Sequence, residues 1–288
     1  MCATCGCSDH QHAPEGHTHS HSHDHDHARL HDPDAGPGHD LDHLPGHEDG
    51  HGHHHDDRDA RARGVIQLER DVLARNALLA ERNRGWFLGR GILALNLVSS
   101  PGAGKTALLE RTIRDLGATL PILVIEGDQA TARDAERIRA AGARALQITT
   151  GTVCHLDAAM VARALRELDP PPGSVVMIEN VGNLVCPALF DLGEHGKVVI
   201  VSVPEGDDKP IKYPHMFRAS DVMVLNKIDL LPHVRFDVAR CIAFARQVNP
   251  RLEVLEVSAT RGDGLEAWYA WLRACRSGPG ATGVARSG

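Results

Sequence analysis

Short apolar runs alternate with charged, helix-like stretches along most of the chain. Between residues 91 and 274 this spacing predicts strands at 92–98, 120–125, 145–148, 175–178, 198–203, 222–225 and 252–257. Uninterrupted apolar strands separated by helices are typical of a parallel sheet that is covered on both faces. The pattern therefore predicts an α/β fold, with a mostly parallel sheet and helices on both faces.

Segments of different composition flank this predicted α/β domain, which we place at residues 91–275. Residues 64–90 carry apolar side chains at mixed spacings of three and four among charged ones, which predicts an amphipathic linker helix. Residues 1–63 have almost no large apolar side chains and are expected to form a disordered, Cys/His-rich, metal-binding tail. Residues 276–288 are rich in Gly, Ser and Ala, and a flexible C-terminal tail is expected there.

Charge divides unevenly between the tail and the rest of the chain. The 288 residues have a formal net charge of −7, but residues 1–63 alone hold 13 acidic and 4 basic side chains, and 16 of the 20 histidines. The remaining 27 basic and 25 acidic side chains include no basic run, so no nucleic-acid partner is expected. No segment approaches the roughly 18 apolar residues of a membrane span, and the N-terminus lacks a signal-peptide core. We expect a cytoplasmic protein without a membrane partner.

A phosphate-binding loop follows the first predicted strand. The segment Ser99-Ser100-Pro101-Gly102-Ala103-Gly104-Lys105-Thr106 has the pattern of a P-loop, with Ser99 where the consensus has its first glycine. Its backbone N–H groups would hold the phosphates, Lys105 would reach the β and γ oxygens, and Thr106 would bind Mg²⁺. The alternative, a glycine-rich turn without a ligand, is disfavoured by the intact Gly-Lys-Thr between a strand and a helix. The candidate nucleotide-binding residues here are Ser100, Gly102, Ala103, Gly104, Lys105 and Thr106.

Two further motifs indicate that the base is guanine. Asn226-Lys227-Ile228-Asp229 comes directly after the predicted strand 222–225. The Asp229 carboxylate would accept hydrogen bonds from both N–H donors on the guanine edge, while Asn226 and Lys227 would shape the pocket. Ser258 and Ala259 end the next strand, where a backbone N–H would reach the guanine carbonyl. GTP is therefore expected rather than ATP.

Acidic residues close two other predicted strands. Asp128 ends the second strand, and Glu179-Asn180-Val181-Gly182 follows the strand at 175–178, where many GTPases carry Asp-x-x-Gly. Asp128 and Glu179 are both candidates to hold Mg²⁺ or its water, and the Gly182 amide would sense the γ-phosphate. Exposed acidic groups at strand ends are the alternative. The candidate catalytic residues are Lys105, Asp128, Glu179 and Gly182. Because no arginine finger or catalytic glutamine is identifiable in the sequence, GTP hydrolysis should be slow.

Three features indicate soft-metal binding. Cys2, Cys5 and Cys7 can wrap one ion, and the α-amine of Cys2 would add a nitrogen ligand if the initiator Met is removed. Such thiol and amine ligands favour Ni²⁺ or Cu²⁺. A redox Cys-x-x-Cys would need a thioredoxin-like unit, which is not evident. Histidines spread from His10 to His55 would bind several ions weakly, and the Asp residues between them argue against an expression tag.

The third metal feature lies inside the predicted domain. Cys154 and His155 are placed at the start of a predicted helix, and Cys186 follows Gly182 by four residues. Three ligands are one short of a tetrahedral site, which a second subunit or an exchangeable ligand would complete. An adjacent pair on one helix chelates poorly, which also favours ligands from two chains. A buried structural cysteine is the alternative for each thiol; it is the interpretation adopted for Cys241 and Cys275, each on a predicted helix.

The motifs together resemble the nickel-insertion GTPases of NiFe-hydrogenase maturation, in the dimerising P-loop GTPase class that includes the urease accessory GTPase. The resemblance covers residues 64–275 and the N-terminal region. It implies a tight nickel motif at Cys2, Cys5 and Cys7, and a site for nickel or zinc at a dimer interface, formed by Cys154, His155 and Cys186. Residues 204–210 resemble a further family segment, to which no chemistry is assigned. The Cys-Pro-His motif of the urease relative is not found in this sequence.

The resemblance implies a GTP-hydrolysing nickel metallochaperone that stores nickel and delivers it to the NiFe-hydrogenase large subunit. GTP and Mg²⁺ would order the loops at Asp128 and Gly182 and favour a homodimer, which metal would also stabilise. The implied partners are the hydrogenase large-subunit precursor and a companion nickel-insertion accessory protein. The alternatives are a urease accessory GTPase, a nickel store that is not coupled to GTP hydrolysis, and a P-loop kinase or ATPase.

Overall fold

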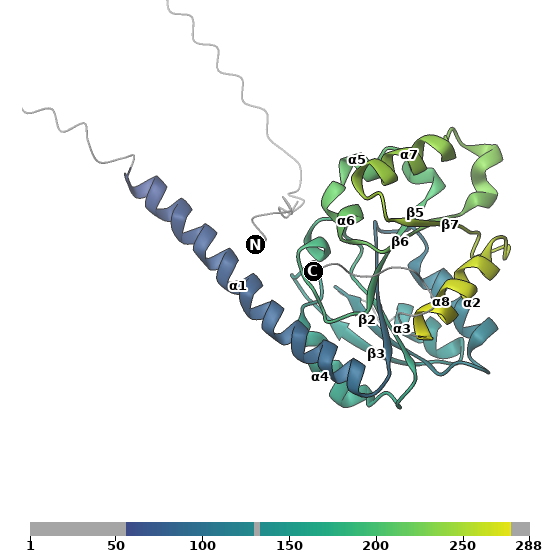
Figure 1. Ribbon diagram of the computed structural model, residues 1–288, viewed down its shortest axis with the longest axis horizontal. Coiled ribbons are helices and arrows are strands. Elements are labelled where there is room, and N and C mark those ends of the chain that lie inside the picture. The colour runs from purple at the N-terminus through teal and green to yellow at the C-terminus, as the bar shows by residue number, and fades with distance from the viewer. Residues whose placement is uncertain (1–55, 130–132, 278–288) are drawn as a thin grey trace, which may run out of the picture. The chain divides into compact units, whose positions relative to one another are not determined.

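Seven parallel strands form the centre of the molecule. The computed structural model describes residues 56–129 and 133–277, with side chains from Gln67 onward. The strands are β1 (Leu93–Ser99), β2 (Ile122–Asp128), β3 (Arg144–Thr149), β4 (Val175–Glu179), β5 (Gly196–Ser202), β6 (Val222–Asn226) and β7 (Glu253–Glu256). Their order across the sheet is β3-β2-β4-β1-β5-β6-β7, and each neighbouring pair is parallel. Figure 1 shows the sheet, with β2, β3, β5, β6 and β7 labelled.

Helices cover both faces of this sheet. The α-helices are α1 (Asp56–Gly89), α2 (Lys105–Leu116), α3 (Arg133–Ala140), α4 (Ala158–Leu168), α5 (Lys209–Lys212), α6 (Pro214–Ala219), α7 (Val238–Val248) and α8 (Leu265–Arg276). Short 3-10 helices are η1 (Cys186–Ala188), η2 (Val203–Glu205) and η3 (Ile228–His233). The buried clusters place α2, α3 and α8 on one face and α1, α4, α6 and α7 on the other. The predicted parallel α/β fold is confirmed, with each of the seven predicted strands present and only their ends shifted.

Alternation along β1 explains how one strand serves both faces. Leu93, Leu95 and Leu97 pack in the cluster that contains α2 and α8, whereas Ala94 and Val98 belong to clusters on the opposite face. Side chains of consecutive strand residues point to opposite faces, so a fully apolar strand in the middle of a sheet feeds two cores at once. This burial fixes β1 at the centre and with it the loop that follows Ser99.

Helix α1 begins at Asp56, before the start of the linker helix predicted at 64–90. From Gln67 onward it packs on the α/β domain through two asparagines. Asn83 donates from Nδ2 to the carbonyl oxygens of Ala158 and Leu192, at 2.9 and 3.0 Å. Asn76 accepts at Oδ1 from the Ala158 amide at 2.9 Å. The predicted tails at 1–63 and 276–288 fall almost entirely outside the described residues, so the proposed domain boundaries remain predictions.

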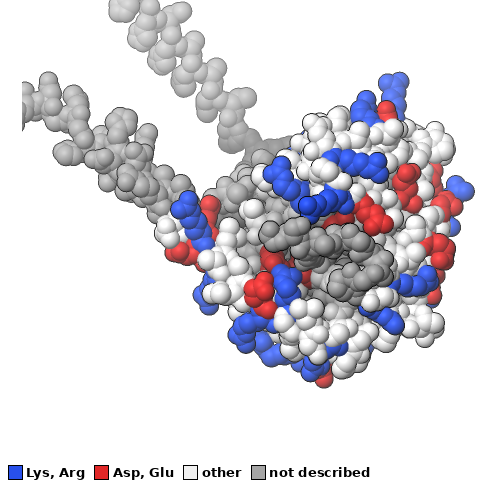
Figure 2. All heavy atoms as spheres, in the orientation of Figure 1, with Lys and Arg blue, Asp and Glu red and all other residues white. Residues whose placement is uncertain are grey.

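Charged side chains of both signs are interspersed on the face shown in Figure 2. Among the described helices, none combines the length and the apolar composition that crossing a membrane requires. The carboxyl ends of β1, β2, β4 and β6 lie at one edge of the sheet, where open parallel sheets bind their ligands. That edge therefore brings together the motifs that follow these four strands.

Candidate functional site

The loop after β1 has the tight backbone geometry of a phosphate-binding loop. Gly102 and Gly104 have positive φ angles of 77° and 97°, and a Cβ atom on Gly104 would lie 2.5 Å from Nδ2 of Asn226. Lys105 donates from Nζ to Oγ of Ser99 at 2.9 Å, and burial lowers the pKa of this lysine. Ser99, which replaces the first glycine of the consensus, thus holds the lysine that is expected to meet the phosphates.

Two buried carboxylates lie beside this loop. Thr106 donates from Oγ1 to Oε1 of Glu179 at 2.7 Å, and Glu126 is the register partner of Glu179 on the adjacent strand β2. Burial raises the pKa of Glu179 to about 7. Burial, followed by repulsion from Glu179, raises the pKa of Glu126 to about 8. The carboxylate of Asp128 accepts a 2.7 Å hydrogen bond from the Gln129 amide, beside the segment 130–132 that the structure does not describe.

The carboxylates have the chemistry of a hard-cation site. Among the described residues, Oε2 of Glu126 and Oε2 of Glu179 are buried without a hydrogen-bond partner. Leaving a buried carboxylate oxygen unpaired costs free energy, and a cation removes that cost. Mg²⁺ takes oxygen ligands such as a carboxylate and a threonine hydroxyl, so Thr106 and Glu179 fit this ion.

The guanine motifs meet the P-loop through hydrogen bonds. Asn226 donates from Nδ2 to the carbonyl oxygen of Ala103 at 2.9 Å and accepts from the Ala259 amide at 3.2 Å. Lys227, with a positive φ of 62°, donates from Nζ to the carbonyl oxygen of Gly102 at 2.7 Å. Ser258 donates from Oγ to Oδ1 of Asp229 at 2.6 Å, which orients a carboxylate that remains partly exposed. The structure therefore assembles the predicted base-binding residues around one end of the loop.

The segment 204–210, to which the sequence assigned no chemistry, also reaches the P-loop. Lys209 donates from Nζ to Oγ of Ser100 at 3.0 Å and lies 3.4 Å from Oε2 of Glu205. Glu205 in turn accepts hydrogen bonds from the amide and the hydroxyl of Ser202, at 2.9 and 2.7 Å. The ammonium group of Lys209 is thus held next to the phosphate-binding loop by the carboxylate of Glu205, in η2 directly after β5.

A second centre, of different chemistry, is formed by Cys154, His155 and Cys186. Their ligand atoms all lie within 4.8 Å of one another, and all three residues are buried. The two Sγ atoms are 3.1 Å apart, and Sγ of Cys154 is 3.9 Å from Nδ1 of His155. Burial lowers the pKa of His155, which favours the neutral imidazole that binds metals. Its ring rests on Phe190, with centroids 4.0 Å apart.

Thiolate and imidazole ligands suit nickel, zinc and copper rather than Mg²⁺ or Ca²⁺. A further ligand from a second chain remains a prediction, but the expectation that Cys154 and His155 can hardly chelate together is wrong, because their ligand atoms converge with that of Cys186 within one chain. The error came from placing Cys154 and His155 on a helix. Helix α4 begins only at Ala158, after the N-cap Asp157, whose side chain accepts from the Met160 amide at 2.7 Å. The pair lies in the preceding loop, where adjacent side chains can converge.

The loop of Gly182 lies between the two centres. A Cβ atom on Gly182 would lie 3.0 Å from Cγ and 3.1 Å from N of Pro101, so this glycine allows close approach to the P-loop. Four residues later, Cys186 begins η1. The loop therefore contacts the nucleotide-binding loop at one end and carries a metal-binding thiol at the other.

Some residues of this arrangement have no role predicted from the sequence, and some predicted residues lie outside the part of the chain that the structure describes. Cys2, Cys5 and Cys7 and the histidine tract lie outside the described residues. The sequence assigns no role to Asn180, which lies within the Glu179–Gly182 motif, or to Glu126, which follows the second predicted strand. An acid at the end of an apolar strand beside a P-loop is a usable signal for Glu126. Cys241 and Cys275 lie on α7 and α8 as predicted, and burial raises the pKa of each thiol to about 12.

Comparisons with known proteins indicate which proteins this chain resembles. A family model described as "CobW/HypB/UreG, nucleotide-binding domain" matches residues 93–256. The hydrogenase maturation factor HypB of Rhizobium leguminosarum bv. viciae is 62% identical over 208 residues, covering 72% of this chain and 70% of that protein. The crystal structure of HypB from Archaeoglobus fulgidus superposes with a TM-score of 0.66 at 42% identity, over 70% of this chain and 99% of that one. HypB from Helicobacter pylori, crystallised in complex with nickel, gives a TM-score of 0.67 at 35% identity, over 73% and 99% of the two chains.

Proposed function

Because this chain belongs to the CobW/HypB/UreG family of nucleotide-binding proteins, we propose that it is a GTP-hydrolysing nickel metallochaperone of hydrogenase maturation. It would store nickel and deliver it to the hydrogenase large subunit. The observation that carries the proposal is the convergence of Cys154, His155 and Cys186 at the end of the loop that contacts the P-loop through Gly182. A change in this loop on nucleotide binding would therefore move one of the metal ligands.

The nucleotide half of the proposal is supported by the assembled P-loop and base-binding residues. Lys105 would reach the β and γ oxygens, and Asp229 would accept from the guanine edge while Ser258 orients it. Mg²⁺, which supplies charge neutralisation to the phosphates, would be held by Thr106 and Glu179. Asp128 and Gly182 would respond to the γ-phosphate. We expect slow, Mg²⁺-dependent conversion of GTP to GDP and phosphate.

The metal half of the proposal is supported by the donor set. Two thiols and an imidazole bind nickel, and the same set is compatible with zinc. Three protein ligands leave one position for an exchangeable ligand or for a second copy of the chain, which is consistent with a homodimer favoured by GTP or metal. An open position also provides a route for handing the ion to an acceptor. The acceptors proposed are the hydrogenase large-subunit precursor and a companion nickel-insertion accessory protein.

Nickel release from the purified, nickel-loaded chain tests the coupling directly. Release to a chelator is followed with GTP and with a nonhydrolysable GTP analogue, and we expect GTP to accelerate it. The Lys105→Ala variant, which loses a phosphate contact, should release nickel at one rate under both conditions. Identical rates with GTP and analogue in the unmodified chain would overturn the proposal and favour a nickel store that is not coupled to hydrolysis.

A further inference from the structure

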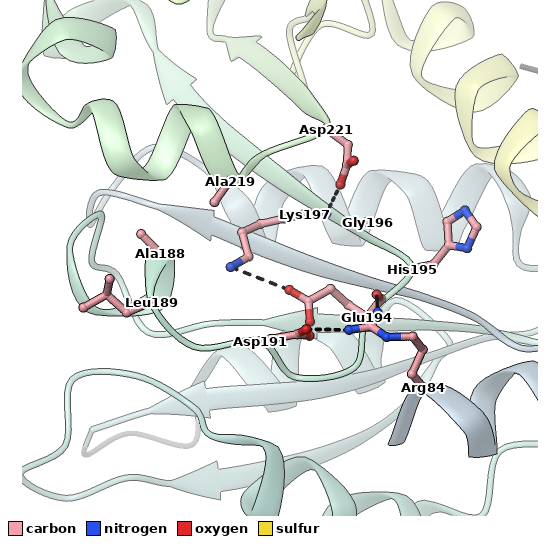
Figure 3. Close-up of a pocket in the computed structure, with 10 residues that line it drawn as sticks. All are labelled: Arg84, Ala188, Leu189, Asp191, Glu194, His195, Gly196, Lys197, Ala219 and Asp221. Atoms are coloured by element: carbon pink, nitrogen blue, oxygen red, sulfur yellow. Dashed lines mark hydrogen bonds and ion pairs between the residues drawn. The ribbon is translucent and has the colours of Figure 1, made fainter. Parts of the chain in front are cut away.

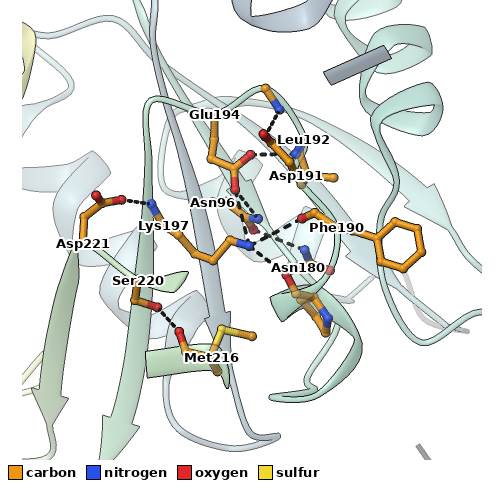
Figure 4. A network of polar contacts seen from close by, with 12 residues as sticks. Asn96, Asn180, Phe190, Asp191, Leu192, Glu194, Lys197, Met216, Ser220 and Asp221 are labelled. Atoms are coloured by element: carbon orange, nitrogen blue, oxygen red, sulfur yellow. Dashed lines mark hydrogen bonds and ion pairs between the residues drawn. The ribbon is translucent and has the colours of Figure 1, made fainter. Parts of the chain in front are cut away.

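A network of buried polar side chains joins β1 and β5 to the segments that follow β4 and η1 (Figure 4). It starts at Asn96 of β1, which is fully buried on the face that Ala94 and Val98 make apolar. Asn96 donates from Nδ2 to Oε1 of Glu194 at 3.1 Å and accepts at Oδ1 from Nδ2 of Asn180 at 3.2 Å. A polar residue in such a place is costly unless it is fully paired, so its partners are held in fixed positions.

Asn180 is the point where this network meets both functional centres. Its Oδ1 accepts hydrogen bonds from the amides of Leu156 and Val181, each at 3.0 Å. Leu156 directly follows the candidate ligand His155, and Val181 directly precedes Gly182 at the P-loop. The backbone of Asn180 is itself anchored, because its backbone N–H donates to the carbonyl oxygen of Leu97 at 3.0 Å. One side-chain oxygen thus joins the loop of the metal ligand to the loop that contacts the phosphate-binding loop.

The other end of the network anchors the segment that follows Cys186. Lys197 donates from Nζ to the carbonyl oxygens of Pro187 and Phe190, at 2.8 and 3.4 Å, and lies 3.7 Å from Oε1 of Glu194. Glu194 also accepts from the Leu192 amide at 2.7 Å. These charged groups border a cavity of about 310 Å³, where Arg84 pairs with Asp191 at 2.5 Å (Figure 3). The segment that follows Cys186 in the chain is therefore attached to β5 through the Lys197 side chain.

A second asparagine provides a contrast within the same loop. Asn183 donates from Nδ2 to the carbonyl oxygen of Cys154 at 3.4 Å and accepts from the Val185 amide at 2.7 Å. It joins the two ligand-bearing loops to each other, as Asn180 does, and it directly follows Gly182 in the chain. Its side chain, however, reaches the metal loop through a single 3.4 Å hydrogen bond to the Cys154 carbonyl and does not contact the Leu156 amide beside His155. Asn183 therefore offers a second, longer contact between the Gly182 loop and the metal centre, against which the role of Asn180 can be compared.

We propose that Asn180 is a positioning residue that couples the nucleotide to the metal centre. When the γ-phosphate moves Gly182, the Val181 amide moves with it and changes its hydrogen bond to Oδ1 of the anchored Asn180. Because this oxygen is shared, the hydrogen bond that it accepts from the Leu156 amide changes as well. His155 then shifts relative to Cys186, whose own segment stays anchored by Lys197. The inference rests on the proposed function, since it names the residue through which GTP would change the affinity for nickel.

The test is the nickel dissociation constant of the Cys154–His155–Cys186 centre, measured with GDP and with a nonhydrolysable GTP analogue. Every chain compared, including the one called unmodified, carries alanine at Cys2, Cys5 and Cys7, and binding is followed by thiolate-to-nickel absorption, which the histidine tract does not produce. The ratio of the two constants measures the coupling, which in coupled proteins is roughly 5- to 150-fold. In Asn180→Ala we expect this ratio to fall close to 1. Asn180→Ser retains a short acceptor for the neighbouring Val181 amide but cannot reach Leu156, and should lose the ratio with a smaller effect on folding. Asn180→Asp keeps an oxygen for both amides but loses the donor to Asn96, so it should retain the ratio and melt at a lower temperature.

Asn183→Ala is the matched control. It should weaken nickel binding in both nucleotide states by the same factor and leave the ratio unchanged. Because coupling is reciprocal, nickel must shift the affinity for the GTP analogue by the same factor in the unmodified chain, and this shift should vanish in the Ala and Ser variants at position 180. Thermal melts identify any variant that is not folded.

The outcomes separate the inference from the function on which it rests. If the ratio of the two nickel dissociation constants differs from 1 in the unmodified chain and the folded Ala or Ser variant retains it, Asn180 is not the coupling residue, although the proposed function stands. If the two nickel dissociation constants of the unmodified chain are equal, both the inference and the proposed function are overturned. Loss of the ratio in Asn183→Ala to the same extent as in Asn180→Ala would also overturn the inference, because any disturbance of the metal centre would then have the same effect.

Discussion

The hydroxyl of Thr106 and the carboxylate of Glu179 are joined by a 2.7 Å hydrogen bond, which links the first turn of α2 to the end of β4. Both residues are buried, and Oε2 of Glu179 has no hydrogen-bond partner within the described part of the chain. The sequence left open whether Asp128 or Glu179 would contact Mg²⁺ directly. The position of Glu179 beside the P-loop threonine favours Glu179 for that role.

Glu179→Gln should therefore reduce Mg²⁺-dependent GTP hydrolysis. Glutamine keeps the size of the side chain and an oxygen that can accept from Thr106, but it lacks the charge that would hold the ion. We expect kcat to fall by about 10²-fold or more, with a higher Mg²⁺ concentration needed for half-maximal rate. Steady-state phosphate release over a Mg²⁺ titration measures both. Glu136→Gln, at an exposed position on α3, is the control, and wild-type Mg²⁺ dependence in Glu179→Gln would exclude the assigned role.

The two buried glutamates predict how stability depends on pH. Their pKa values are raised from 4.5 to about 8 for Glu126 and about 7 for Glu179, chiefly by burial. The folded chain then binds protons that the unfolded chain has released, so the free energy of unfolding falls as pH rises from about 4.5 to 8. Each group contributes a slope of up to about 1.4 kcal/mol per pH unit within its own window. Urea unfolding of the protein without nucleotide and Mg²⁺ measures this slope.

Glu126→Gln isolates one of the two contributions. Glutamine does not titrate, so the variant should show a flatter dependence and exceed the unmodified chain in stability most clearly near pH 8. Mg²⁺ with GTP should flatten the profile of the unmodified chain, because a bound cation favours the ionised carboxylates. An equal pH slope in the variant and the unmodified chain would show that Glu126 does not bind the additional proton.

Asp229→Asn tests the choice of base. The substituted side chain can still accept from Ser258, but it presents one oxygen and one amide to the guanine edge in place of two acceptors. Hydrogen bonds to charged groups contribute about 1.5–3 kcal/mol, so GTP affinity should fall by roughly 10- to 150-fold while ATP affinity changes little. Competition binding with the two nucleotides measures this. Asp263→Asn, at an exposed carboxylate of the same region, should bind as the unmodified chain does; a retained preference for GTP in Asp229→Asn would remove this residue from base recognition.

The sequence predicted the fold and the proximity of the candidate nucleotide-binding motifs because both follow from the order of the elements along the chain. Fully apolar strands specify a covered parallel sheet, and the motifs that follow β1, β4 and β6 meet because the carboxyl ends of parallel strands share an edge. Their spatial proximity required no information beyond the order of elements. The structure then added which side chains touch, such as Ser99 with Lys105.

The misplaced start of α4 and the unassigned role of Asn180 have different causes. Asp157 is a recognisable helix N-cap, so the loop position of Cys154 and His155 was available from local sequence. Asn180 depends on Leu156 and Asn96, which are 24 and 84 residues away. Pairings at that distance follow from strand order and register, and a single sequence does not specify them.

The buried cysteines allow a final prediction about the metal centre. To separate it from the tail, Cys2, Cys5 and Cys7 are replaced by alanine in the full-length chain, and nickel binding is followed by thiolate-to-nickel charge-transfer absorption, which histidines do not produce. In that background Cys154→Ala and Cys186→Ala should each weaken binding by roughly tenfold or more, since even residues that only support a ligand cost 10- to 100-fold. Cys241→Ala is the matched control, because this equally buried thiol has its pKa raised to about 12 and lies on α7. Unchanged absorption in Cys186→Ala, or equal loss in Cys241→Ala, would show that nickel binds elsewhere in the chain.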